Sequence, residues 1–157
     1  MLKTDIKWPE HRRYKSRTER EPIGSLSDCL CNATNFDLKL RFFSSSAINV
    51  LSYGFVSFLY NGGKMRLIIN NILTTQDKDA IINGQRHSIV KAYDLADIQN
   101  IYETLSKRDC NFFECLSYYI QQGRLELKII ELKTGTGISH TKVGVFTDGK
   151  SRVAFDL

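Results

Sequence analysis

The sequence has no hydrophobic run long enough to cross a membrane, and no basic segment followed by an apolar core of the kind that directs secretion. Its longest apolar stretch, residues 47–60, is interrupted by Asn49, Ser52, Gly54 and Ser57. Secretion and membrane spanning are therefore not expected, and we interpret the chain as cytoplasmic. Internal repeats and low-complexity tracts are also lacking. The 157 residues are expected to form one globular domain with a real core.

Cysteine occurs four times, but without the C-x2-C spacing that is typical of zinc sites. One residue separates Cys29 from Cys31, and four residues separate Cys110 from Cys115, which stand among apolar residues of an expected helix. A zinc site and a pair of disulfides are the weaker interpretations, and buried free thiols are the stronger one. We expect neither a metal nor another cofactor.

The charge is mildly one-sided, with 22 lysine and arginine residues against 17 aspartate and glutamate residues and a pI near 9.0. An anionic partner is thus favoured, and nucleic acid is the commonest one. Residues 1–23 hold both prolines and carry a net charge of +3 out of the total of +5. We interpret them as a basic arm that wraps around the domain, anchored by Ile6, Trp8 and Tyr14. A DNA-gripping arm is the second interpretation, and the two roles are compatible.

Apolar periodicity after the arm predicts alternating helices and strands. Residues 35–43 and 64–70 are expected strands, and serines at 44–46 and glycines at 62–63 bound a helix between them. This β-α-β unit implies a parallel strand pair with a right-handed crossover. The remaining pattern predicts helices at residues 25–33, 74–83, 93–107 and 109–122, and strands at residues 124–133, near His140 and at residues 151–155, the last two joined in a hairpin.

The residues most suited to chemistry lie in segment 137–148, which reads Gly-Ile-Ser-His-Thr-Lys-Val-Gly-Val-Phe-Thr-Asp. His140 and Lys142 are expected just inside a strand and on the same face, because side chains alternate along a strand. An imidazole can attack phosphorus, and an ammonium can stabilise the charge of the phosphate. The pair therefore predicts phosphodiester cleavage without a metal.

This pair, followed by Asp148 and Gly149, resembles the His-x-Lys…Asp motif of the phospholipase D superfamily. Residues 42–71 are also similar to N-terminal phospholipase D-like domains of bacterial helicase-like and restriction-type proteins, so the resemblance spans residues 25–155. It implies an α/β fold with a mixed, mainly parallel β-sheet flanked by helices on both faces.

The chain departs from the family pattern in two ways. Five residues instead of four separate Lys142 from Asp148, as in the looser variant of nuclease-like members. The chain also stops at Phe155-Asp156-Leu157, where the family's Gly-Ser-x-Asn segment would begin. The domain, residues 24–157, is thus expected to be truncated before that segment or to have lost its residues.

The resemblance implies that His140 is the nucleophile and forms a covalent phosphohistidine, that Lys142 stabilises the nonbridging oxygens and that Asp148 orients the active site. Asp-Gly is also a strong turn signal, so Asp148 could equally be a turn residue. The family needs a second His-x-Lys, but neither His11 nor His87 has a lysine two residues later. Activity is therefore expected to require a homodimer.

Basic charge and the lack of a lipid-inserting segment favour nucleic acid over phospholipid as substrate. The resemblance to restriction-type proteins implies DNA more than RNA. Arg41, Lys64 and Arg66 are candidate nucleic-acid-binding residues, although each could equally be a solvated surface charge. The resemblance implies a helicase domain in the same longer chain or complex, within a restriction or phage-defence system. The alternative is a catalytically incomplete domain that binds nucleic acid or docks onto a protein, and a lipase is the third hypothesis.

Overall fold

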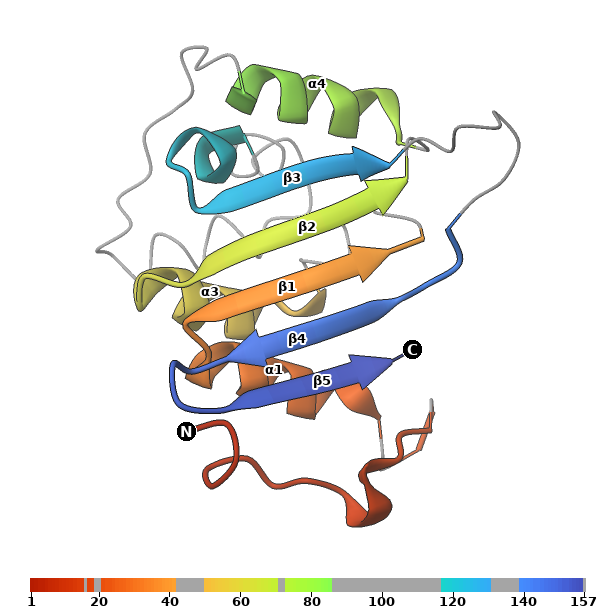
Figure 1. The fold of residues 1–157 in the computed structure, drawn as a ribbon, viewed down its shortest axis with the longest axis vertical. Coiled ribbons are helices and arrows are strands. Elements are labelled where there is room, and N and C mark those ends of the chain that lie inside the picture. Colours follow the sequence, from red (N-terminus) through yellow and green to blue (C-terminus); the bar gives the residue numbers. More distant parts are fainter. Residues whose placement is uncertain are drawn as a thin grey trace.

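The computed structural model describes residues 1–15, 17–18, 21–41, 50–70, 73–85, 117–130 and 139–156. Its centre is a five-stranded β-sheet in the order β3-β2-β1-β4-β5 (Figure 1). Strands β1, β2 and β3 are parallel, whereas β4 is antiparallel to both of its neighbours. The strand bounds are β1 (Asn35–Leu40), β2 (Lys64–Asn70), β3 (Leu125–Ile130), β4 (Val143–Thr147) and β5 (Arg152–Asp156). The expected α/β class with a mixed sheet is confirmed.

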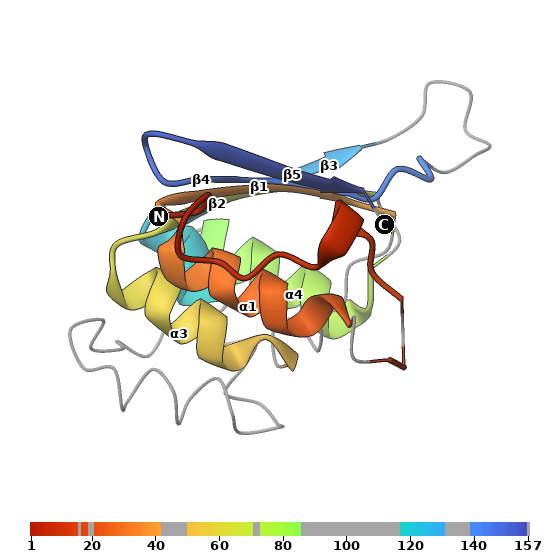
Figure 2. The same cartoon turned by 90° about the horizontal axis from the view of Figure 1, so that it is seen from below.

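The described helices all lie on one face of the sheet (Figure 2). They are α1 (Pro22–Asn32), α3 (Ser52–Tyr60), α4 (Thr75–Gln85) and a helical stretch at residues 117–121, and a short 3-10 helix, η1 (Glu10–Arg12), lies in the arm. Helices on both faces were expected, but the described part of the chain places none on the second face. Two of the expected helices, residues 93–107 and most of residues 109–122, lie outside the described residues.

The β-α-β unit is present as expected, with α3 between the parallel strands β1 and β2. Phe36 pairs with Met65 and Leu38 with Leu67, so the apolar residues of both strands share one face. After α3 the chain turns at Gly62, which has a φ of +82° and supplies the left-handed conformation that ends many helices. The alternation of apolar and polar residues along the strands and the glycine after the helix were thus sufficient to predict this β-α-β unit.

The core lies between the sheet and the helices, and the arm contributes to it. Leu2 and Ile6 are buried with exposed fractions of 0% and 5%, and Trp8 packs against the buried cluster. Phe36 of β1 stacks on Phe146 of β4, with ring centroids 4.1 Å apart. The arm is therefore anchored to the domain, as expected for Ile6 and Trp8, although its most deeply buried side chain is Leu2.

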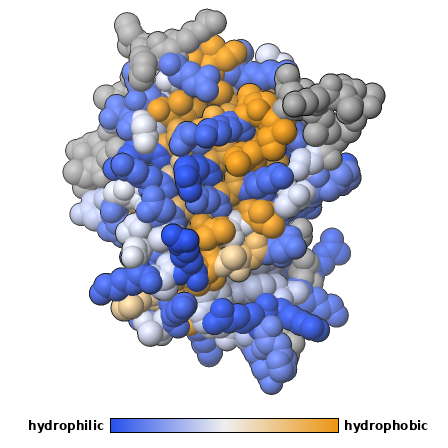
Figure 3. Space-filling view, in the orientation of Figure 1, coloured by the Kyte–Doolittle hydropathy of each residue, from blue (hydrophilic) through white to orange (hydrophobic). Residues whose placement is uncertain are grey.

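The second face of the sheet is crossed by a shallow groove of about 330 Å³. Apolar and charged side chains lie side by side on this face, as the space-filling view shows (Figure 3). The side chains that line the groove are the charged Asp37, Lys39, Arg66, Glu126 and Lys128 and the apolar Ile68, Val143 and Val145. Among the described residues, no helix is both long and apolar enough to span a bilayer.

Candidate functional site

The His140–Lys142 segment lies at the edge of the sheet where the three parallel strands end. β4 is antiparallel to β1, so β4 begins at the edge where β1, β2 and β3 finish (Figure 1). Ligands of open α/β sheets bind at the carboxyl ends of the parallel strands. The position of His140 and Lys142 is therefore one where a substrate site is commonly built.

β4 begins later than the sequence analysis predicted, so the prediction that His140 and Lys142 lie just inside a strand is wrong. His140 and Lys142 precede β4, whose first residue is Val143. Val143 pairs with Lys39 and with Asp156, and these are the last pairs of both ladders. A strand needs backbone partners, and the two ladders supply them no further toward His140 than Val143. The two side chains are exposed and thus open to a substrate.

Asn70 holds the segment to the sheet, and the sequence analysis did not identify it. Its side chain is only 4% exposed at the end of β2. The amide nitrogen donates to the carbonyl of Arg41, 2.6 Å away, and to that of Ser139, 3.2 Å away. The amide oxygen accepts the N–H of Ser139 at 3.3 Å. One buried side chain thus links the end of β1 to the residue before His140.

We expect Asn70→Ala to lower both stability and any activity at this edge. The change leaves the Arg41 carbonyl and both backbone groups of Ser139 without this partner, at a cost of about 1–3 kcal/mol. The loss of this tether would misplace His140, and a displacement near 1 Å can reduce a rate by about 100-fold. Urea unfolding and a cleavage assay measure the two effects. The surface variant Asn83→Ala, on an exposed position of α4, should change neither.

Asp148 lies at the opposite end of β4 from His140 and Lys142. A strand rises about 3.3 Å per residue, so Lys142 and Asp148 are separated by about 20 Å along the chain. The Asp148 carboxylate accepts the backbone N–H groups of Leu2 at 2.8 Å, Lys150 at 2.9 Å and Ser151 at 2.6 Å. It therefore shapes the β4–β5 hairpin and fastens the arm. The structure places it as a turn residue and does not bring it to the histidine.

These contacts make Asp148 a source of pH-dependent stability. The N–H groups of Leu2, Ser151 and Lys150 hold the pKa of the carboxyl well below its usual value. A lowered folded pKa means that the stabilisation is complete above the unfolded pKa, near 3.8, and is lost as the pH falls through the folded pKa. We expect Asp148→Asn to be less stable than the wild type at pH 7, with the difference shrinking below about pH 4.

Urea unfolding between pH 7 and pH 2 would measure this dependence. Asp79→Asn, at an exposed position of α4, is the matched control and should follow the wild type throughout. A constant difference between Asp148→Asn and the wild type across this range would contradict the assigned role.

The three candidate nucleic-acid-binding residues do not lie together. Arg41 follows β1 at the edge that holds His140, whereas Lys64 opens β2 at the opposite edge. Arg66 lies on the second face of the sheet, where its Nε donates to Asp37 at 2.6 Å and its Nη2 to the other carboxylate oxygen. This pairing lowers the pKa of Asp37 and occupies the guanidinium. Of the three, only Arg41 lies at the edge of the sheet that holds His140.

The described cysteines are free thiols, and the expected burial holds for Cys29 only. Cys29 is buried, and burial raises the pKa of its thiol to about 12, so it remains protonated. Cys31 is partly exposed. No cluster of histidine, cysteine or acidic side chains suited to a metal occurs among the residues that the structure describes. Cys110 and Cys115 lie outside those residues.

Searches against protein-family models, curated proteins and solved structures found no match to this chain. The relationship to the phospholipase D superfamily therefore stays a prediction from the sequence. The functional case depends on the residues themselves and on where the fold places them.

Proposed function

We propose that the protein is a metal-independent phosphodiesterase that cleaves nucleic acid, DNA in preference to RNA. The observation that carries the proposal is the exposed His140–Lys142 pair at the carboxyl edge of the parallel strands, tethered through Ser139 to the buried Asn70. The pair supplies a nucleophile and a cation within one short segment. The net charge of +5 favours a polyanion.

The proposed reaction has two steps. In the first, a ring nitrogen of His140 attacks phosphorus, a P–N bond forms, and the P–O bond to the leaving oxygen breaks. In the second, water attacks phosphorus, the P–N bond breaks, and the histidine is regenerated. Lys142 stabilises the negative charge on the nonbridging oxygens in both steps.

The leaving oxygen needs a proton, and the chain holds one His-x-Lys pair. We propose that His140 of the partner subunit donates this proton in the first step and takes one back from the attacking water in the second, so that two copies of the chain form one site. The same proposal includes a phospholipase D-like fold with helices on both faces of the sheet, a cytoplasmic location and a helicase domain in the same longer chain or complex, within a restriction or phage-defence system.

The test is incubation of the purified protein with labelled single- and double-stranded DNA and with RNA, all in EDTA. Cleavage accompanied by a protein-bound phosphate that is stable in base and labile in acid would support the phosphohistidine. Cleavage that depends on added Mg²⁺ would contradict it. Sedimentation at the assay concentration would show whether the active species is a dimer.

A non-catalytic binding or docking domain is the second candidate. The observation in its favour is that the third motif residue, Asp148, is engaged in the hairpin about 20 Å from Lys142. This function predicts salt-sensitive DNA binding without cleavage, since phosphate contacts release counterions on binding. Binding that survives His140→Ala, together with no cleavage by the wild type, would favour it.

A further inference from the structure

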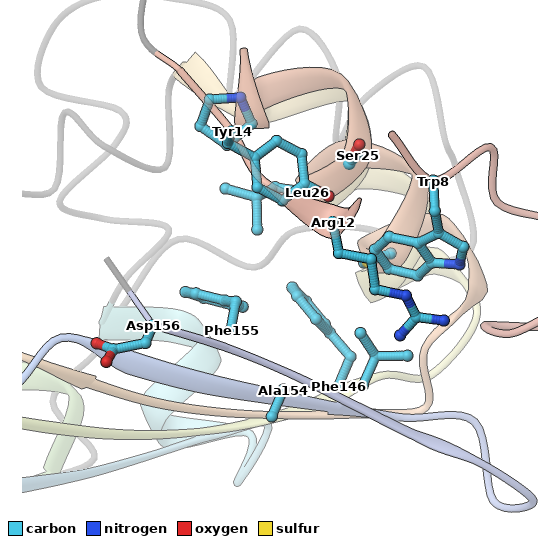
Figure 4. A pocket seen from close by; sticks show the side chains of 12 residues that line it. Trp8, Arg12, Tyr14, Ser25, Leu26, Phe146, Ala154, Phe155 and Asp156 are labelled. Carbon is cyan, nitrogen blue, oxygen red and sulfur yellow. The ribbon is translucent and has the colours of Figure 1, made fainter. Parts of the chain in front are cut away.

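A cavity of about 200 Å³ lies between the arm, α1 and the outer strands β4 and β5 (Figure 4). Aromatic side chains form much of its wall, with Trp8 and Tyr14 from the arm and Phe155 from β5. Arg12 and Asp156 lie toward opposite ends of the opening (Figure 4). The cavity is thus lined by flat apolar surfaces and has the Arg12 cation at its rim, whereas the side chain of Asp156 shares the second face of the sheet with its ladder partner Val143.

The volume restricts the ligand to a small one. Ligand pockets for drug-sized molecules run from about 300 to 1,000 Å³, while an apolar cavity of about 150 Å³ accepts benzene. A cavity of about 200 Å³ therefore suits one flat ring system. Aromatic walls favour such a ring because aromatic rings attract one another in offset-stacked and edge-to-face arrangements.

The positive charge of Arg12 at the rim restricts which flat rings would bind. The Arg12 guanidinium carbon lies 5.2 Å from the centroid of the Trp8 ring, so this wall already carries a cation. A quaternary ammonium, the usual ligand of aromatic cages, would be repelled there. A neutral ring with hydrogen-bond acceptors on its edge would meet Arg12 favourably. A nucleobase has this combination.

The cavity also adjoins the proposed catalytic segment. Asp156 at the cavity rim is the partner of Val143 across the β4–β5 ladder, and Val143 directly follows Lys142. Neighbouring strands are about 4.8 Å apart. A phosphate held by Lys142 would therefore have the base of an adjacent nucleotide within reach of the cavity.

We propose that this cavity is a nucleobase subsite, which holds a base of the substrate strand beside the scissile phosphate. The inference rests on the proposed function, because it is the nucleic acid bound at Lys142 that would supply the base. Stacking on aromatic side chains strengthens single-strand binding by about 10- to 100-fold per base. The subsite would thus make affinity depend on the base and would favour single-stranded or unpaired DNA.

Trp8 provides a direct readout, since it is the only tryptophan in the chain and lines the cavity. A short single-stranded oligonucleotide, titrated in EDTA, should quench its fluorescence to saturation. The same oligonucleotide with an abasic nucleotide at each position should bind about 10- to 100-fold more weakly and leave the fluorescence unchanged. Equal quenching by the abasic strand would overturn the subsite.

Ser25→Phe tests the cavity itself, because Ser25 lines it from α1 and a phenyl ring there would fill it. The variant should lose the quenching and the preference for the base-containing strand. Ile23→Phe adds the same ring at a position of α1 that is 43% exposed and outside the cavity, and it should behave as the wild type. Thermal unfolding of both variants checks that each is folded. Unchanged quenching in a folded Ser25→Phe would overturn the proposal.

Failure of the subsite and failure of the nuclease proposal are separable. Quenching in wild type and His140→Ala without cleavage by either would sustain the subsite and overturn the nuclease. Cleavage that is equal for abasic and base-containing strands would sustain the nuclease and overturn the subsite. Quenching by choline with none by the oligonucleotide would identify a cage for cations and overturn the nucleobase assignment.

Discussion

His140→Ala is expected to reduce metal-free cleavage of DNA by about 10³- to 10⁶-fold. Removing the nucleophile of a covalent mechanism leaves only binding and electrostatic stabilisation, and losses of this order follow in enzymes of that kind. Single-turnover cleavage in EDTA, with protein in excess over labelled DNA, measures the effect without interference from product release. The exposed position of His140 means that the change should leave the unfolding free energy nearly unaltered.

His11→Ala is the matched control for this experiment. His11 is also exposed, and it lies in the arm beside Glu10, 3.5 Å from that carboxylate. It should retain wild-type cleavage and wild-type stability. Full activity in His140→Ala would contradict the assignment of the nucleophile, and equal losses in both variants would indicate a general effect of removing imidazole.

The local architecture was predictable because it depends on neighbouring residues. In β2, buried Met65, Leu67 and Ile69 alternate with Lys64 and Arg66, and the pattern of the sequence predicts the strand. The Asp-Gly turn between β4 and β5 was predictable for the same reason, since Gly149 adopts a φ of +85°.

The limits of the strands depend on partners that are distant in sequence. His140 and Lys142 have the spacing of strand residues, yet the ladders to β1 and β5 end at Val143. No local pattern contains that information. The role of Asn70 is hidden in the same way, because its partners Arg41 and Ser139 are 29 and 69 residues away. The signal that the sequence offered for this role was that a polar residue, Asn70, ends an apolar strand.

The motif shows how a spacing can be read in two ways. The interval from Lys142 to Asp148 suggested a catalytic set, but all five intervening residues form β4 and hold the two ends apart. Asp148 accepts the N–H of Leu2, which is 146 residues distant, and this contact cannot be inferred from either segment alone. The arm was expected to wrap around the domain. The residue that holds it there is Asp148, which the sequence allowed to be either an active-site residue or a turn residue.

The largest expected effect on stability is that of Phe58→Ala in α3. Phe58 is fully buried, and its ring meets that of Phe55 edge to face, with centroids 6.5 Å apart. A methyl group added at Gly63 would lie 2.4 Å from the Phe58 ring, so the chain is packed closely around it. Removing the ring leaves a cavity that such surroundings cannot readily close. We expect a loss of about 3–5 kcal/mol, a large part of the 5–15 kcal/mol that stabilises a typical domain.

Tyr53→Ala on the same helix separates packing from helix propensity. Tyr53 is 67% exposed, so its removal should change the unfolding free energy by no more than about 0.5 kcal/mol. Urea unfolding followed by circular dichroism measures both variants at one pH. Because α3 is the crossover between β1 and β2, loss of its packing should also weaken the edge that carries Asn70 and His140. Similar stabilities of Phe58→Ala and Tyr53→Ala would mean that α3 does not pack on the sheet through Phe58.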